Sequence, residues 1–167
     1  MLYSKMKSLV LIIIFIFCFY SLSTAQIDYS VVEIHNLYVK PIVKVLLNGK
    51  AAYFLLDTGS DIDLLHSKSA KKYNISISTR NIGSNDRLVD VNGKFNTFDY
   101  IYDLNMMIGE KHIYGNFISM DISSIVTSIR NKTDTTISGI IGSETMKNYS
   151  FIIDYERQAI MFKSGLK

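Results

Sequence analysis

The sequence predicts an all-β fold with one or two short helices, and three observations lead to this prediction. Apolar residues occur mostly in short runs bounded by turn residues, as is typical of strands. Asn-Gly pairs, the strongest short hairpin signal, join neighbouring runs at Asn48-Gly49 and Asn92-Gly93. Only Ser67–Tyr73 and Ser143–Tyr149 look helical. A chain of 167 residues is long enough for one domain with a substantial core.

Residues 1–25 are predicted to be a secretory signal peptide. Lys5 and Lys7 precede an apolar run from Leu9 to Leu22, and small residues lead up to a cleavage site after Ala25. This run is short for a membrane-spanning helix, which needs roughly 20 apolar residues. We therefore expect an exported protein, periplasmic or secreted, with no membrane contact after cleavage. The alternative is a protein tethered by an uncleaved apolar segment.

Removal of the signal peptide would leave a nearly neutral chain without cysteine. Cys18 is the only cysteine, so no disulfide or thiol chemistry is expected. Sixteen basic residues would remain beside 15 acidic ones (18 − 2 = 16), and their scattered placement gives no support for nucleic-acid binding. The histidines, His35, His66 and His112, lack metal-ligand spacing, so neither a metal nor another cofactor is expected.

After the signal peptide, residues 26–38 are expected to form an N-terminal extension and residues 39–167 the folded domain. The domain is expected to contain four hairpins: Pro41–Leu56 turning at Asn48-Gly49, Arg87–Phe98 turning at Asn92-Gly93, Tyr102–Met120 turning at Gly109, and Tyr149–Phe162 turning near Glu156-Arg157. The polar stretch Thr127–Thr136 is predicted to be a loop.

Two segments of the domain resemble each other. The first is FLLDTGS, at residues 54–60, and the second is GIIGSET, at residues 139–145. Each is an apolar run ending in a glycine-containing turn, and each precedes a short helix and then a strand. Two related halves packed into one β domain are the simplest account of this repeat.

Asp57 is the candidate functional residue, because it ends an apolar strand and is followed by Thr58, Gly59 and Ser60. Glycine permits backbone angles and close approaches that a Cβ would prevent. The two hydroxyls can hydrogen-bond the carboxylate or the neighbouring backbone. A carboxylate held in this way is positioned and tunable in pKa, as general acid–base catalysis requires. The structural alternative is an Asx-type turn, in which Asp57 only bonds its own backbone.

The Asp57 motif, the later Ile140-Ile141-Gly142 and the closing run GIIGSETMKNYSFIIDYERQAIMF resemble the retropepsin-like aspartic proteases. The similarity is strongest to single-domain, exported bacterial members and covers roughly Val39 to Phe162. It implies a small closed β-barrel with one or two short helices and a hairpin flap that folds over the substrate. The implied activity is aspartic-type endopeptidase activity on peptide or protein substrates.

The resemblance also implies a role for each matching residue. Asp57 would be the catalytic acid and base. Thr58 would form hydrogen bonds between two subunits beneath the paired acids, and Gly59 would give the substrate access to the backbone. Ser60 would bond the carboxylate, and Gly142 would support the active-site loop from below.

The flap would be the hairpin around Val91, Asn92 and Gly93, which has only one glycine near its tip. A second departure from the retroviral pattern concerns the residue after the downstream glycine. Retroviral members have an arginine there, paired with the acid two residues beyond the glycine of the first motif. In this chain Asp61 is present but Ser143 follows the glycine, so that ion pair is missing.

Aspartic proteolysis uses two carboxylates that share a proton. This sequence contains one Asp-Thr-Gly, since Asp134-Thr135 is followed by threonine and lies in a polar stretch. The expected enzyme is therefore a homodimer that pairs Asp57 with its symmetry mate. The main alternative is a catalytically silent β domain that binds a peptide or a partner protein, because a fold does not guarantee its chemistry. An unrelated β-barrel, in which Asp57 is only a turn residue, is a third interpretation.

Overall fold

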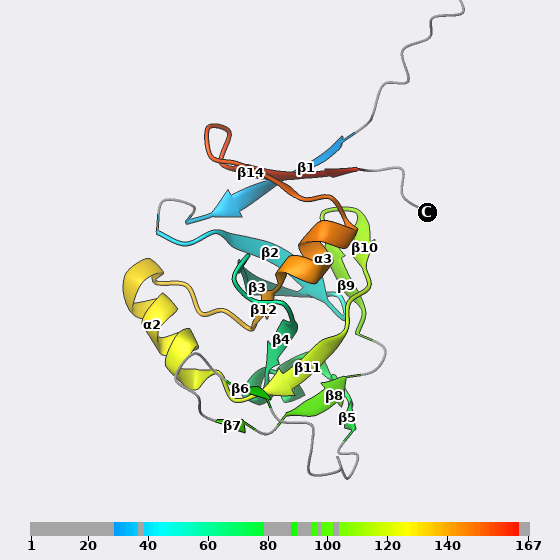
Figure 1. Cartoon of the computed structure of the whole chain (residues 1–167), viewed down its shortest axis with the longest axis vertical. Coiled ribbons are helices and arrows are strands. Elements are labelled where there is room, and N and C mark those ends of the chain that lie inside the picture. Colours follow the sequence, from blue (N-terminus) through cyan, green and yellow to red (C-terminus); the bar gives the residue numbers. More distant parts are fainter. Residues whose placement is uncertain are drawn as a thin grey trace, which may run out of the picture.

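The structure is a computed structural model that describes residues 29–36, 39–78, 88–89, 95–96, 98–101 and 104–163 (Figure 1). The strands are β1 Tyr29–His35, β2 Ile42–Leu47, β3 Lys50–Leu56, β4 Asp63–His66, β5 Ile77–Ser78, β6 Leu88–Val89, β7 Phe95–Asn96, β8 Asp99–Ile101, β9 Met106–Ile108, β10 Lys111–Ile113, β11 Phe117–Met120, β12 Gly139–Ile141, β13 Ile152–Asp154 and β14 Ala159–Lys163. The helices are the 3₁₀ turns η1 Ser67–Ser69 and η2 Lys71–Tyr73, with the α-helices α2 Ser123–Thr133 and α3 Ser143–Asn148.

One sheet dominates the fold, which confirms a strand-rich class with few helices. Its strands follow the order β13-β14-β1-β2-β3-β12-β4-β11-β8-β5, and β9 pairs with β2 and carries β10. The closed barrel is not confirmed, because in the described part of the chain the path ends at β13 and β5 without pairing between them. The sheet divides at β1. The first part of this strand, Tyr29 to Glu33, pairs with β14, and only Ile34 and His35 pair with β2. In Figure 1, β1 and β14 accordingly lie as a layer above β2.

Three of the four predicted hairpins turn where the turn residues predict. Asn48 and Gly49 have φ angles of 48° and 76°, and the favoured two-residue hairpin turns need such positive angles. Gly109, with φ 57°, turns β9 into β10, and β13 and β14 are joined by the turn at 155–158. In the second hairpin, β6 and β7 pair antiparallel. Its turn and the predicted flap residues, Val91 to Gly93, lie outside the described residues.

The predicted loop at Thr127–Thr136 is wrong over most of its length, because the chain is helical up to Thr133 in α2. Its apolar residues Ile122, Ile125, Val126 and Ile129 follow the i, i+3, i+4, i+7 spacing of an amphipathic helix. All four pack in or against one core cluster. The polar residues that suggested a loop form the exposed face of the helix.

Strands β3 and β12 lie in the centre of the fold and are buried on both faces. Along β3 the side chains alternate, so that Phe54 and Leu56 belong to one core cluster and Leu55 to the other. Ile141 and Ile140 of β12 divide between the clusters in the same way. Burial on both sides explains why both strands are continuous apolar runs.

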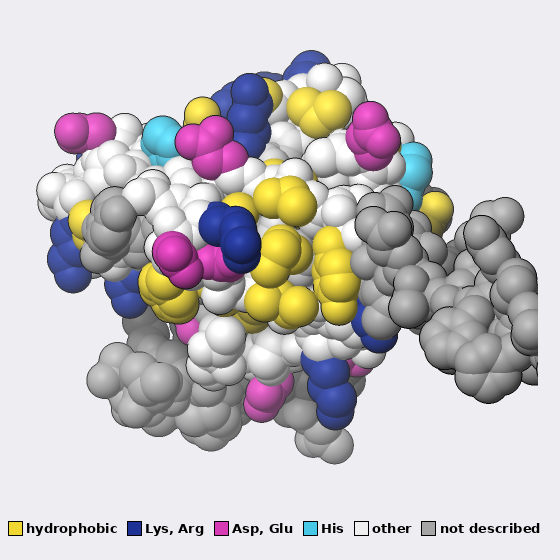
Figure 2. Space-filling model, turned by 90° about the horizontal axis from the view of Figure 1, so that it is seen from above, with side chains coloured by type: hydrophobic (Ala, Val, Ile, Leu, Met, Phe, Trp, Pro, Cys, Tyr) yellow, Lys and Arg dark blue, Asp and Glu magenta, His cyan; other side chains and the backbone are white. Residues whose placement is uncertain are grey.

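Part of the predicted N-terminal extension is built into the sheet. Strand β1 pairs with β14 from Tyr29, opposite Lys163, to Glu33, opposite Ala159. Figure 2, seen from above, shows apolar side chains gathered on the outer face of this layer, where Val31 is 61% exposed. The predicted signal peptide lies outside the described residues, and its cleavage site and the domain boundary stay predictions. Within the described ranges, no helix is long and apolar enough to cross a membrane.

The start of α2 gives a testable prediction about Asp121. Its Oδ1 accepts hydrogen bonds from the Ser123 hydroxyl (2.6 Å) and the Ser123 N–H (2.9 Å), which with Lys68 lower the pKa of Asp121 to about 2. The Ser123→Ala protein should therefore show a pKa for Asp121 that is raised toward 3.8, as measured by NMR titration. Ser124→Ala, which changes the neighbouring exposed serine, is the control. An unchanged pKa in Ser123→Ala would contradict this cause.

Candidate active site

Asp57 directly follows β3, and its backbone is tied to β12. Strands β3 and β12 run parallel, with Leu56 opposite Ile141, and the Asp57 N–H donates to the Ile141 carbonyl oxygen at 3.0 Å. The structure thus brings together Asp57 and Gly142, which are 85 positions apart in the sequence (142 − 57). An unrelated barrel with these residues far apart does not describe this protein.

The topology explains why these two segments meet. Strand β12 lies between β3 and β4, so the loop at 57–62 has to cross the end of β12 to connect its two neighbours. Gly142 lies under this crossing, where an added Cβ would come within 2.5 Å of the Ile62 carbonyl oxygen and 2.8 Å of that of Ser60. The Ser143 N–H also donates to the Ser60 oxygen at 2.7 Å. The two loops are therefore in direct backbone contact.

The Asp57 carboxylate is half-buried and held by its own turn. Its Oδ1 accepts the Gly59 N–H at 3.0 Å, and its carbonyl oxygen accepts the Ser60 N–H at 3.2 Å. The Asx-type turn considered from the sequence is thus present. It restricts the carboxylate through Oδ1, whereas within the described ranges no hydrogen bond reaches Oδ2. Thr58 and Gly59 are exposed beside it.

The role expected for Ser60 is not seen, and Ser143 makes a hydrogen bond that the resemblance does not imply. The Ser60 hydroxyl donates to the Ile62 carbonyl oxygen at 2.8 Å, so its one hydrogen is not given to the Asp57 carboxylate. The Ser143 hydroxyl donates to Asp61 Oδ1 at 3.3 Å. A single hydrogen bond from an uncharged serine therefore links the two loops at the place where the retroviral pattern has an ion pair.

Asp63 is a residue of this site that sequence reasoning missed. It begins β4, is only 3% exposed, and accepts hydrogen bonds from the Gly142 N–H on Oδ1 (2.8 Å) and the Thr145 hydroxyl on Oδ2 (2.5 Å). Burial raises the pKa of Asp63, the two hydrogen bonds oppose this rise, and the nearby Glu144 carboxylate adds to it. The sequence signal is an acid inside the apolar run Ile62 to Leu65, since a buried acid needs partners.

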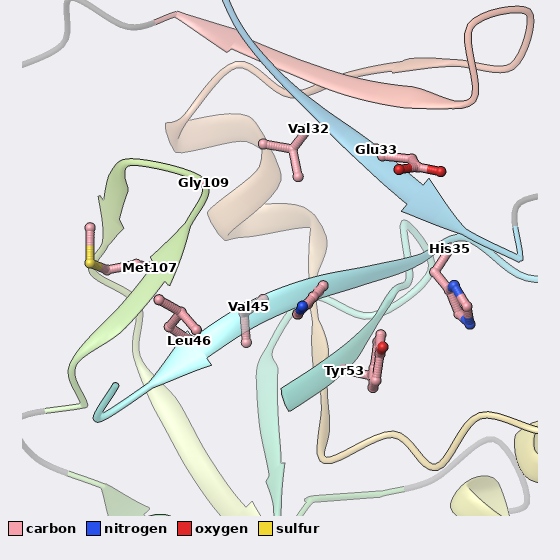
Figure 3. A pocket seen from close by; sticks show the side chains of 9 residues that line it. Val32, Glu33, His35, Val45, Leu46, Tyr53, Met107 and Gly109 are labelled. Carbon is pink, nitrogen blue, oxygen red and sulfur yellow. The ribbon is translucent and has the colours of Figure 1, made fainter. Parts of the chain in front are cut away.

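Among the residues that the structure describes, no three His, Cys, Asp or Glu side chains are grouped so that they could hold a metal ion. A surface pocket of about 380 Å³ lies between β1, β2, β3 and β9 (Figure 3). Val32, Leu46, Tyr53 and Met107 are among its lining residues, and none of the lining residues comes from 57–62 or 141–145. This pocket is therefore separate from the Asp57 loop.

Comparisons with known proteins support the fold. No family model and no curated protein matches this sequence. Among solved structures, the retroviral protease-like domain of Ddi1 from Leishmania major is similar, with 12% identity over 77% of this chain and 90% of that one, at a TM-score of 0.51. EIAV protease in complex with the inhibitor HBY-793 has 19% identity over 70% and 93%, at a TM-score of 0.50. A retropepsin-like aspartic protease from Rickettsia conorii has 13% identity over 81% and 89%, at 0.46. The chain has the retropepsin-like fold.

The contacts of Gly142 predict a cost for any side chain at this position. Gly142→Ala should lower the free energy of unfolding by about 1–3 kcal/mol, because its methyl group would overlap the backbone of the crossing loop. Urea denaturation measures this loss. Lys147→Ala, at an exposed position of α3, is the control and should change stability by less than about 0.5 kcal/mol. Equal stability of Gly142→Ala and the wild type would show that the loop does not rest on Gly142.

The raised pKa of Asp63 predicts a pH dependence of stability. The folded state holds the Asp63 proton more tightly than the unfolded state does. The contribution of this group to the free energy of unfolding is therefore complete below about pH 3.8, the ordinary pKa of an aspartate. It is lost as pH rises through the raised pKa. The free energy of unfolding of the wild type, relative to Asp63→Asn, should therefore fall as pH rises over this window. Denaturant titrations across pH measure the difference, and a difference that rises with pH would contradict the shift.

Proposed function

We propose that this chain is an aspartic endopeptidase that hydrolyses peptide bonds in extended segments of peptide or protein substrates, with Asp57 as its catalytic carboxylate. The observation that carries the proposal is the placement of Asp57. It directly follows a strand buried on both faces, its carboxylate is restricted by the Gly59 N–H, and its own N–H donates to the carbonyl oxygen of Ile141, the residue before Gly142. In a retropepsin-like fold, this is the position from which a carboxylate can meet a second one.

The reaction needs that second carboxylate. One acid takes a proton from a water molecule that attacks the scissile carbonyl carbon, while the other acid donates a proton to the carbonyl oxygen. The neighbouring acids of the same chain are unsuited to the second role. Asp63 is buried with both oxygens engaged, and Asp61 accepts the Ser143 hydroxyl.

A second copy of Asp57 is therefore the proposed partner, brought in by an isologous homodimer. The exposure of Thr58 and Gly59 leaves the surface around Asp57 accessible to such a copy. We include the hairpin around Val91, Asn92 and Gly93 as the flap that closes over the substrate. The proposed setting is outside the cytoplasm, periplasmic or secreted, after cleavage behind Ala25.

A catalytically silent, peptide- or partner-binding domain is the second candidate. The observation in its favour is the single Ser143–Asp61 hydrogen bond, from an uncharged donor, in place of the retroviral ion pair. Sedimentation equilibrium separates the two candidates, since a chain that stays monomeric at high concentration cannot assemble the pair of acids.

The direct test of the proposed activity is the Asp57→Asn variant. The wild-type mature chain should cleave members of a peptide library at acidic pH, in a manner inhibited by pepstatin. Asp57→Asn should keep the fold and lose cleavage by about 10³-fold or more, because one proton-transfer group is removed from each half of the site.

Asp134→Asn is the matched control for this experiment. It changes the other Asp-Thr pair of the chain, at an exposed position in the left-handed region that asparagine tolerates. Its cleavage should equal that of the wild type. Equal cleavage by the wild type and Asp57→Asn would end the assignment.

A further inference from the structure

The buried carboxylate of Asp63 is not used by the proposed reaction, yet both of its oxygens are bound by one short segment. Oδ1 accepts the Gly142 N–H and Oδ2 accepts the Thr145 hydroxyl, at 2.8 and 2.5 Å. The Asp63 backbone belongs to β4, which pairs with β11 on one side and β12 on the other. The side chain thus connects a strand of the sheet to the backbone immediately beneath the Asp57 loop.

Three further hydrogen bonds connect the segment held by Asp63 to the loop that carries Asp57. The Ile141 carbonyl oxygen accepts the Asp57 N–H, the Ser143 N–H donates to the Ser60 oxygen, and the Ser143 hydroxyl donates to Asp61. Residues 141–143 are therefore held by Asp63 from below and themselves hold residues 57–61 above. Gly142 cannot move toward the crossing loop, because it already lies against the backbone of Ile62.

We propose that Asp63 is a positioning residue of the active site, whose carboxyl group sets the place of the Gly142 backbone and through it that of Asp57. This inference rests on the proposed function for its effect on catalysis. Its structural part concerns the hydrogen bonds alone and holds whether or not the chain is a peptidase.

The hydrogen bonds survive a change of charge at Asp63. In the ionised form the carboxylate accepts from both partners. When protonated, it can still accept the Gly142 N–H on Oδ1 while its own hydroxyl donates to Thr145 Oγ1. An asparagine side chain offers the same acceptor and donor pattern. What the site requires is thus an acceptor for Gly142 and a polar partner for Thr145, not a negative charge.

The groups around Asp63 are consistent with this role. The α3 helix presents Thr145 and Glu144, and Glu144 is the one charged group within the described ranges that acts on the pKa of Asp63. The absence of a side chain at Gly115 leaves room for the carboxylate. A Cβ on Gly115 would lie 2.6 Å from Asp63 Oδ2, 2.9 Å from Thr145 Oγ1 and 2.9 Å from the ring of the buried Phe117. Gly115→Ala should therefore displace the carboxylate, its nearest neighbour, and press on the Phe117 ring, without changing any residue of the two loops.

The first measurement does not depend on activity. Amide hydrogen exchange, followed by NMR in the folded proteins, reports on the Gly142 and Asp57 N–H groups. In Asp63→Leu, exchange of both amides should accelerate by about tenfold or more, because Gly142 loses its acceptor. Asp63→Asn should restore wild-type exchange, and Gly115→Ala should accelerate it. If Asp63→Leu does not fold, Gly115→Ala and Asp63→Asn give the answer.

The second measurement separates positioning from general stability. In an active wild type, Asp63→Leu and Gly115→Ala should lower kcat by about tenfold or more and change KM less than about threefold, since Asp57 is displaced and substrate contacts are kept. Asp63→Asn should recover kcat.

The outcomes distinguish this inference from the proposed function. Unchanged exchange of Gly142 and Asp57 in Asp63→Leu or Gly115→Ala would overturn the inference, and so would an Asp63→Asn protein as impaired as Asp63→Leu. A wild type without peptidase activity, together with the expected exchange pattern, would overturn the proposed function and leave the positioning role supported.

Discussion

The insertion of β12 between β3 and β4 is the constraint on which the rest of the site depends. Since β3 and β4 are consecutive in the chain, the loop that joins them has to pass over the end of the strand between them. The passage forces close backbone contact, which only a residue without a side chain allows at Gly142. The same passage places Asp57 at the end of a strand that is buried on both faces and cannot tilt without disturbing two core clusters. A rigid support for a half-exposed carboxylate follows from the strand order itself.

Acids in different surroundings serve different purposes in this chain. Asp121, exposed just before α2, has its pKa lowered to about 2 by hydrogen bonds from Ser123. It accepts the backbone N–H of Ser123, the first residue of this helix. Asp63, buried beneath the loops, has its pKa raised by desolvation and links β4 to α3. Asp57 lies between these extremes, half-buried and engaged through one oxygen. Of these three acids, Asp57 is the one with an oxygen that accepts no hydrogen bond within the described residues.

Turns were predictable from the sequence. Contacts between distant residues were predictable only where both residues belonged to a recognisable motif. The Asn48-Gly49 turn follows from backbone angles that few residues adopt, and Asp57 and Gly142 could be matched through the resemblance of their surroundings. The helix α2 was missed because the polar residues of its exposed face hid the apolar spacing beginning at Ile122. Asp63 was missed because its partners are 79 and 82 residues away. Barrel closure depends on where the outermost strands pair, which no local pattern specifies.

If two copies of Asp57 form one reaction centre, as we propose, their carboxyl groups must lie within hydrogen-bonding distance of each other. A crystal structure of the mature chain bound to pepstatin tests it most directly. The account predicts a two-fold axis between the protomers, with the two Asp57 carboxyl groups about 3 Å apart and facing the inhibitor's hydroxyl. A monomer, or a dimer that leaves the two carboxyl groups on separate surfaces, would contradict the account.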